Sequence, residues 1–193
     1  MTGPRVEAPQ EPEQEPVNRP RLYVASLADY VAGRLHGEWL SAAQPIDALE
    51  ADVQAMLNRS TEPHAEEIAI HDFDGFAGYE PGEYESLERL VKVAQGIVDH
   101  GPAFGAWAAH CGVELDQLEQ FEEAFRGEWP SLHAYADELL ADLGAIESLE
   151  QVSPWLQPYV HLDVAGFARD LYLSGDVWTA PSPDGAFVFD GTL

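Results

Sequence analysis

Leu22-Tyr23-Val24-Ala25-Ser26 is an apolar run with β-branched and aromatic residues, which predicts a strand. Further strands are predicted over 34–40, after a turn at Ala32-Gly33, and over 67–73. Between these two strands, apolar residues recur with helical spacing from Ile46 to Leu57, directly after Pro45. The sequence therefore predicts a small β-β-α-β unit over about 22–80.

The remainder of the chain is mainly helical in pattern. Apolar residues recur with helical spacing over 86–98, 102–111, 115–125, 131–143 and 164–172. Gly144 follows the fourth of these segments and suits a helix C-terminal cap. Short strands at 176–179 and 186–190, joined through Pro183-Asp184-Gly185, predict a β-hairpin. We expect an α+β fold made of several small lobes in series.

Residues 1–21 differ in composition from everything that follows. They contain five prolines and four glutamates and have few apolar side chains. Such a segment cannot bury a core, so we expect a disordered tail.

The charge balance is extreme and belongs to the part expected to fold. The 193 residues include 35 Asp and Glu against nine Lys and Arg, a net charge of −26. Residues 22–193 hold 31 of those carboxylates and six of the cations, and Gly112–Val152 has eleven carboxylates against Arg126 alone. Like charge repels nucleic acid and anionic membrane, so we expect neither as a partner.

Other features of the sequence point to a reducing compartment inside the cell. The single cysteine, Cys111, cannot form an internal disulfide. No apolar segment approaches the roughly 20 residues of a spanning helix, and the N-terminus lacks the apolar region of a signal peptide. We expect a cytoplasmic protein.

The carboxylates invite comparison with a polynucleotide backbone. B-DNA carries one charge per ~1.7 Å of axis, so 25 net charges correspond to about 42 Å of duplex. Carboxylates at helical i,i+3 and i,i+4 positions stand about 5–6 Å apart, near the spacing of neighbouring phosphates. Such a face can offer anions to a DNA-binding protein. Acidic, lysine-poor composition is also typical of salt-adapted proteins, so that alternative stays open.

Several blocks in the chain resemble the ArdA-type antirestriction proteins. They are 22–30 (LYVASLADY), 33–40 (GRLHGEWL), 68–74 (IAIHDFD) followed by Glu83-Tyr84, 167–171 (FARDL) and 173–178 (LSGDVW). They lie in the family's order and span 22–190. The resemblance gives structural roles to Asp72, Arg169, Asp170, Ser174 and Gly175. For Arg169 and Asp170 we weigh contact with a partner against an ion pair that holds the last helix to the hairpin, and favour the ion pair.

The resemblance implies an elongated dimer of three small domains, encoded on plasmids and conjugative elements. It places the domains at 22–80, 81–126 and 127–193, with the dimer contact in the last. It also implies a non-enzymatic DNA mimic, without cofactor or metal, that occupies the DNA groove of type I restriction-modification enzymes and blocks restriction. The carboxylates that we expect to bind the partner are Asp47, Glu50, Asp52, Glu85, Glu88, Glu114, Asp116, Glu119, Glu122, Glu123, Glu128, Asp137, Glu138, Asp142, Glu147 and Glu150.

Other residue patterns have alternative interpretations. His71, Asp72 and Asp74, with His161 and Asp163, could form a metal site of a metal-dependent enzyme, although coincidences are common in so acidic a chain. His110 and Cys111 are helix neighbours, about 100° apart, so they form no catalytic dyad. The aromatic side chains suit a core or the dimer contact. They are Tyr23, Trp39, Phe73, Trp155, Tyr159, Phe167, Tyr172 and Trp178.

Overall fold

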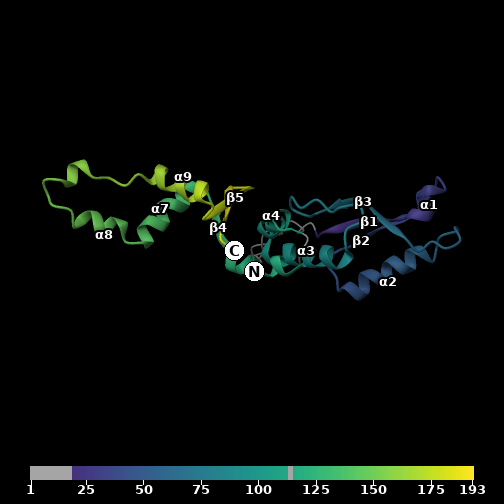
Figure 1. The fold of residues 1–193 in the computed structure, drawn as a ribbon. Helices are drawn as coiled ribbons and strands as arrows, with labels where there is room; N and C mark the ends of the chain where they lie inside the picture. The colour runs from purple at the N-terminus through teal and green to yellow at the C-terminus, as the bar shows by residue number, and fades with distance from the viewer. Residues whose placement is uncertain (1–18, 113–114) are drawn as a thin grey trace, which may run out of the picture. The chain divides into compact units, whose positions relative to one another are not determined.

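The computed structural model describes residues 19–112 and 115–193, and these divide into two compact units (Figure 1). The first unit contains the residues up to Phe76 together with Pro81–Val98. The second contains Ala77–Glu80 together with Asp99–Leu193. Each unit combines helices with a three-stranded antiparallel sheet, which confirms the predicted α+β class.

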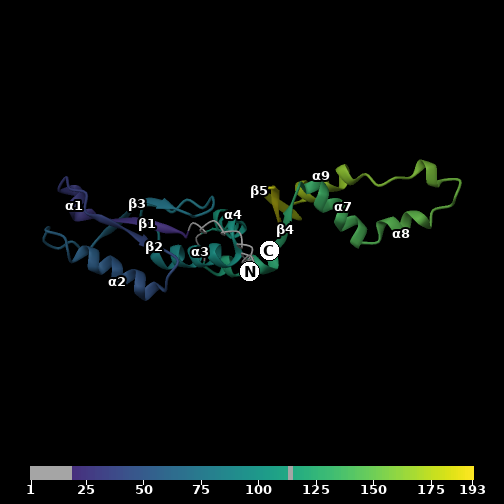
Figure 2. The ribbon, with the colours of Figure 1, turned by 180° about the vertical axis from the view of Figure 1, so that it is seen from behind.

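The sheet of the first unit has the strand order β2-β1-β3. All three predicted strands and both predicted helices of this stretch are present, and Figure 2 shows α2 running along one face of the sheet. The helix α1 was not predicted, because five residues are too few to show a helical period. The elements are β1 (Arg21–Ser26), α1 (Leu27–Val31), β2 (Gly37–Ser41), α2 (Ile46–Leu57), β3 (Ile68–Asp74) and α3 (Leu87–His100).

The period of two along the strands separates the two faces of this sheet. Leu22 and Val24 are fully buried on the core face, with Leu49 of α2 also buried. Tyr23 and Trp39 pair on the opposite face with ring centroids 5.7 Å apart, and Arg21 places its guanidinium 4.8 Å from the Trp39 ring. Trp39 is exposed, so the expectation of a core role for it is wrong.

The fold begins earlier than the predicted end of the tail. Residues 1–18 of that tail lie outside the described residues. Pro20 is fully buried and its carbonyl accepts a 2.9 Å hydrogen bond from Ala42 N, while Arg21 is already in β1. The boundary at 21 is therefore too late by at least two residues.

A buried carboxylate fixes α1 to the loop after α2. Ser26 caps α1 by accepting from the Asp29 backbone N–H at 3.3 Å. The Asp29 carboxylate accepts from the Ser60 hydroxyl and from the Arg34 guanidinium. The hydrogen bond from Ser60 has the largest effect and, with the others, holds the pKa of Asp29 below its usual range. Burial acts in the opposite direction and raises this pKa. Asp29 is thus a structural anion.

The sheet of the second unit has the order β4-β6-β5, and both pairs are antiparallel. Helices α7 and α9 pack against each other, and in both views α8 lies at the end of α7 away from the sheet. The elements are α4 (Pro102–His110), α5 (Leu115–Glu119), α6 (Phe121–Ala124), β4 (Phe125–Trp129), α7 (Leu132–Asp142), α8 (Ala145–Glu150), the 3-10 helix η1 (Gln157–Tyr159), α9 (Val164–Ser174), β5 (Val177–Ser182) and β6 (Gly185–Asp190).

The predicted helices at 102–111, 131–143 and 164–172 and the C-terminal hairpin are confirmed. Gly144 has a φ of 73° directly after α7, as expected for a left-handed cap. The single helix predicted over 115–125 is wrong. The chain forms two short helices there, and Phe125 begins the strand β4, which pairs with β6 from about 60 residues further on. A local pattern does not reveal so distant a partner.

Aromatic side chains form the core of the second unit. Phe189 of β6 is fully buried, and its ring centroid lies 4.2 Å from Trp178, 5.4 Å from Phe125 and 5.7 Å from Trp107. Trp178 therefore takes the core role that was one of its two expected roles.

Two further sequence-based expectations bear on the architecture. The three-domain division stays a prediction. β4 spans the expected boundary at 126 and joins the sheet formed with β5 and β6. In the part of the chain that the structure describes, no helix has the length and apolar character needed to span a membrane.

Candidate protein-binding surface

The carboxylates that the sequence singled out lie mainly at the surface. Glu114 lies outside the described residues, and Glu85 is only partly exposed. The other fourteen carboxylates are all exposed: Asp47, Glu50, Asp52, Glu88, Asp116, Glu119, Glu122, Glu123, Glu128, Asp137, Glu138, Asp142, Glu147 and Glu150.

Apart from Glu128 of β4, these carboxylates lie on helices, and the amphipathic pattern of the helices explains their exposure. Helix α2 buries Leu49, Val53 and Met56, so Asp47 and Glu50 face solvent one turn apart. In α5 and α6 the buried side chains Leu118 and Phe121 leave Glu119 and Glu122 exposed. The apolar spacing that builds the core thus also sets the spacing of the anions.

Helices α7 and α8 carry five of these charges in a part of the sequence that has no lysine or arginine. We call Asp137, Glu138, Asp142, Glu147 and Glu150 the α7–α8 carboxylates; all five are exposed. Glu138 and Asp142 stand at i,i+4, and Glu147 and Glu150 at i,i+3, which separates neighbours by about 5–6 Å. No lysine or arginine occurs between Arg126 and Arg169 in the sequence. This segment is therefore a continuous source of negative charge.

The arginines of the folded part are engaged inside the chain. Each of the six from Arg21 on forms a salt bridge, and with one exception the carboxylate partner is outside the predicted binding set. The pairs are Arg21–Asp74, Arg34–Asp29, Arg34–Glu62, Arg59–Glu38, Arg89–Glu85, Arg126–Asp190 and Arg169–Asp170. In these pairs the arginines neutralise carboxylates that, apart from Glu85, lie outside the predicted set.

Glu85 is the exception, and its placement corrects our expectation of a freely available charge. Arg89 is 5% exposed, and its Nε lies 3.1 Å from Glu85 Oε1. The second oxygen of Glu85 accepts from Gly82 N at 2.9 Å. Both oxygens therefore serve the start of α3, and we leave Glu85 out of the binding surface.

The motif residues of the C-terminal block have local structural surroundings. Gly175 ends α9 with a φ of 81°, and the Ser174 hydroxyl donates to Asp176 at 2.7 Å. Arg169 and Asp170 pair with each other across 3.6 Å, and both are exposed. The expected ion pair between α9 and the hairpin is therefore wrong, because these two side chains engage each other.

The structure does not assemble the candidate metal site. The side chain of Asp72 accepts from Phe73 N at 2.8 Å, Asp74 pairs with Arg21, and the His71 ring packs on Tyr30 at 4.8 Å. A bulge in β3 opposite Tyr23 and Val24 sets these directions. Within 19–112 and 115–193, no three His, Cys, Asp or Glu side chains are grouped so as to hold a metal ion.

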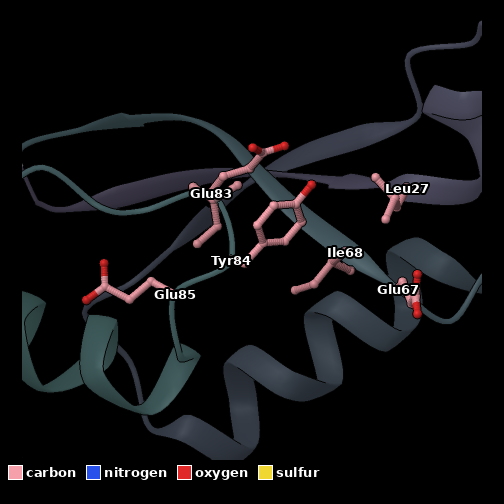
Figure 3. Close-up of a pocket in the computed structure, with 7 residues that line it drawn as sticks. Leu27, Glu67, Ile68, Glu83, Tyr84 and Glu85 are labelled. Atoms are coloured by element: carbon pink, nitrogen blue, oxygen red, sulfur yellow. The ribbon is translucent and has the colours of Figure 1, made fainter. Parts of the chain in front are cut away.

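A cavity in the first unit combines apolar and acidic walls (Figure 3). Its volume is about 390 Å³, and it lies beside β3, which is an edge strand of the described sheet. Leu27, Ile68 and Ile70 supply aliphatic walls. Tyr84 stands at the centre of the view with Ile68 below its ring. Glu67, Glu83 and Glu85 supply the acidic part.

Except for Glu85, these residues were not predicted from the sequence to form a site. The walls come from three separate stretches of the chain, at 27, 67–70 and 83–85, and each stretch alone is unremarkable in composition. The Ile70 N–H donates to the Glu83 carbonyl at 2.9 Å and so holds two of the stretches together. The available signal was the Glu83-Tyr84 pair among the resembling blocks.

The fold and surface together define an acidic α+β protein whose helices present carboxylates to solvent. The sequence model of the family described as Antirestriction protein (ArdA) matches residues 22–183, and the chain belongs to this family. No curated protein sequence matches it significantly. Membership confirms the resemblance and implies antirestriction activity through interaction with restriction enzymes.

Proposed function

We propose that this protein blocks type I restriction-modification enzymes by occupying the groove in which they bind DNA. The observation that carries the proposal is the separation of charges: the arginines are paired internally, while fourteen predicted carboxylates are exposed. Lys and Arg side chains that neutralise phosphates would find carboxylates at a similar spacing. Base edges have no counterpart on such a surface, so recognition would use the groove that reads the backbone.

The direct test is competition for the enzyme. Labelled duplex is bound to the methyltransferase core of a type I enzyme, and the full chain is added. We expect release of the DNA, with an effect that weakens as salt rises because the contacts are between exposed charges. Parallel assays of cleavage and methylation on one substrate show whether both activities are lost. Unchanged DNA binding at high protein excess would contradict the proposal.

The salt-adapted alternative gives the opposite result at low salt. A salt-adapted protein unfolds there, because its carboxylates repel one another without screening. A DNA mimic stays folded and binds best. Circular dichroism of the pure protein across salt concentrations, recorded beside the competition curve, therefore separates the two.

We also propose that two copies associate through the apolar side chains around α8 and η1. Trp155 and Tyr159 are 73% and 76% exposed, and Ile146 and Val160 are also exposed. Large aromatic side chains in such numbers are unusual on a monomer and typical of interfaces. A dimer would double the length of anionic surface offered to an enzyme.

Sedimentation measures this association directly. We expect twice the chain mass of 21.2 kDa for the unaltered protein and the monomer mass for a Trp155→Ser/Tyr159→Ser variant. Leu35→Ser is the control, because Leu35 is 69% exposed but belongs to the first unit. A monomeric unaltered protein, or a dimer that survives the double change, would rule out this contact.

A further inference from the structure

The cavity beside β3 has the two-part chemistry of a site for a long basic side chain. Leu27 and Ile68 line one part with aliphatic groups, and the Tyr84 ring stands beside them (Figure 3). Exposed carboxylates of Glu67 and Glu83 also line the cavity; Figure 3 shows Glu67 next to Ile68 and Glu83 on the other side of the Tyr84 ring. Lysine and arginine side chains are chemically complementary to such a cavity, because each has an apolar stem that packs on aliphatic walls and a cation at its tip.

The three carboxylates that line the cavity differ in their polar contacts. Glu85 already holds Arg89 and Gly82 N. The Tyr84 hydroxyl donates to Glu83, and this bond with the nearby negative charge raises the pKa of Tyr84. Tyr84 is thus held as a neutral phenol whose ring faces the cavity, and a cation is attracted to such a ring.

We propose that this cavity receives an arginine or lysine side chain of the protein partner. Its stem packs on Leu27, Ile68 and Tyr84, and the negative charges of Glu67 and Glu83 attract its cation. The volume of about 390 Å³ is near the lower end of ~300–1,000 Å³ for small-molecule sites, which suits one side chain. An anionic ligand would meet two like charges there.

The choice of partner rests on the proposed function. The cavity differs from the helix surfaces in how much of the binding free energy a single contact contributes. On the helix surfaces the anions are exposed, and each contributes little. A cation whose stem is buried beside an aromatic ring is the typical arrangement of a hot spot. The cavity would therefore act as one anchoring point within an otherwise distributed contact.

The first experiment needs no restriction enzyme. Nα-acetyl-L-arginine methylamide is titrated into the full ¹⁵N-labelled chain, with Nα-acetyl-L-leucine methylamide as the apolar control. We expect saturable amide shifts at Leu27, Ile68, Ile70 and Tyr84 with the arginine probe, and loss of these shifts in Glu67→Gln/Glu83→Gln. Equal shifts with the leucine probe, or shifts spread over all exposed carboxylates, would overturn the inference.

The second experiment uses the competition assay with variants of equal charge. Glu67→Gln/Glu83→Gln should weaken competition about tenfold, as loss of a hot spot does. The matched control is Glu66→Gln/Glu80→Gln, two exposed carboxylates outside the cavity, with an expected change of about twofold or less. Tyr84→Ala removes a wall without altering charge, and should weaken competition to a similar degree.

The outcomes separate the two hypotheses. If the unaltered protein competes but the cavity and control variants behave alike, the cavity has no anchoring role and the proposed function stands. If the unaltered protein does not compete, the proposed function fails, and the arginine titration alone decides whether the cavity binds a basic side chain.

Discussion

Conversion of all five α7–α8 carboxylates to amides should weaken competition with DNA about 30-fold to 150-fold. An exposed ion pair contributes about 0–1 kcal/mol, so five together reach about 2–3 kcal/mol, and 1.4 kcal/mol is a factor of ten. The changes are Asp137→Asn, Glu138→Gln, Asp142→Asn, Glu147→Gln and Glu150→Gln. The measurement is the protein concentration that releases half of the labelled duplex from the methyltransferase core.

The control for this variant is a single change in the same segment. Asp142→Asn alone should shift the midpoint by about twofold or less, because one exposed charge is a small part of the contact. The variant with all five changes should also keep its thermal unfolding midpoint, because the five side chains are exposed and their replacement removes repulsion between like charges. The idea that many carboxylates share the contact is refuted if Asp142→Asn alone abolishes competition, or if the variant with all five changes competes normally.

Replacement of Phe189 by alanine should destabilise the second unit by about 3–5 kcal/mol. Phe189 is fully buried and its ring lies against Trp178, Phe125 and Trp107, so truncation leaves a large cavity in a close-packed aromatic core. The measurement is urea unfolding followed by tryptophan fluorescence, because Trp107 and Trp178 report directly on this core.

Two comparisons test the interpretation of that result. Tyr172→Ala removes an aromatic side chain that is 54% exposed in the same unit, and should change stability by about 0.5 kcal/mol or less. Phe189→Leu should fall between the two, because it keeps most of the buried volume. A Phe189→Ala midpoint equal to that of the unaltered protein would show that the aromatic cluster does not hold the unit together.

The elements that could be predicted are those whose signal is local. β1 to β3 and α2 follow from alternating or helical runs bounded by turn residues, and Gly144 reveals its cap by type and position. Phe125–Trp129 carries no such signal, since its pairing with β6 is decided by residues about 60 positions away. Phe125 also continues the apolar spacing of Leu118 and Phe121, which made the strand look like the end of a helix.

For the surface, too, features with a local signal could be predicted from the sequence, and features that depend on tertiary packing could not. Exposure of carboxylates on α2 and α7 follows from helical periodicity, which places them opposite the apolar stripe. The engagement of Glu85 by Arg89 is an i,i+4 pair visible in the sequence, but its burial depends on the packing around α3. The cavity at Tyr84 depends wholly on tertiary structure, because its walls come from three separated segments.

The order of β4, β6 and β5 has a consequence for biosynthesis. β6 is the middle strand of the second sheet, but it leaves the ribosome after both β4 and β5. At about 5–20 residues per second, β4 waits several seconds for its neighbour, whereas β1 to β3 can assemble once residue 74 has emerged. During that interval the nascent second unit exposes an unsatisfied strand edge, and the surplus of negative charge around it discourages other chains from pairing there.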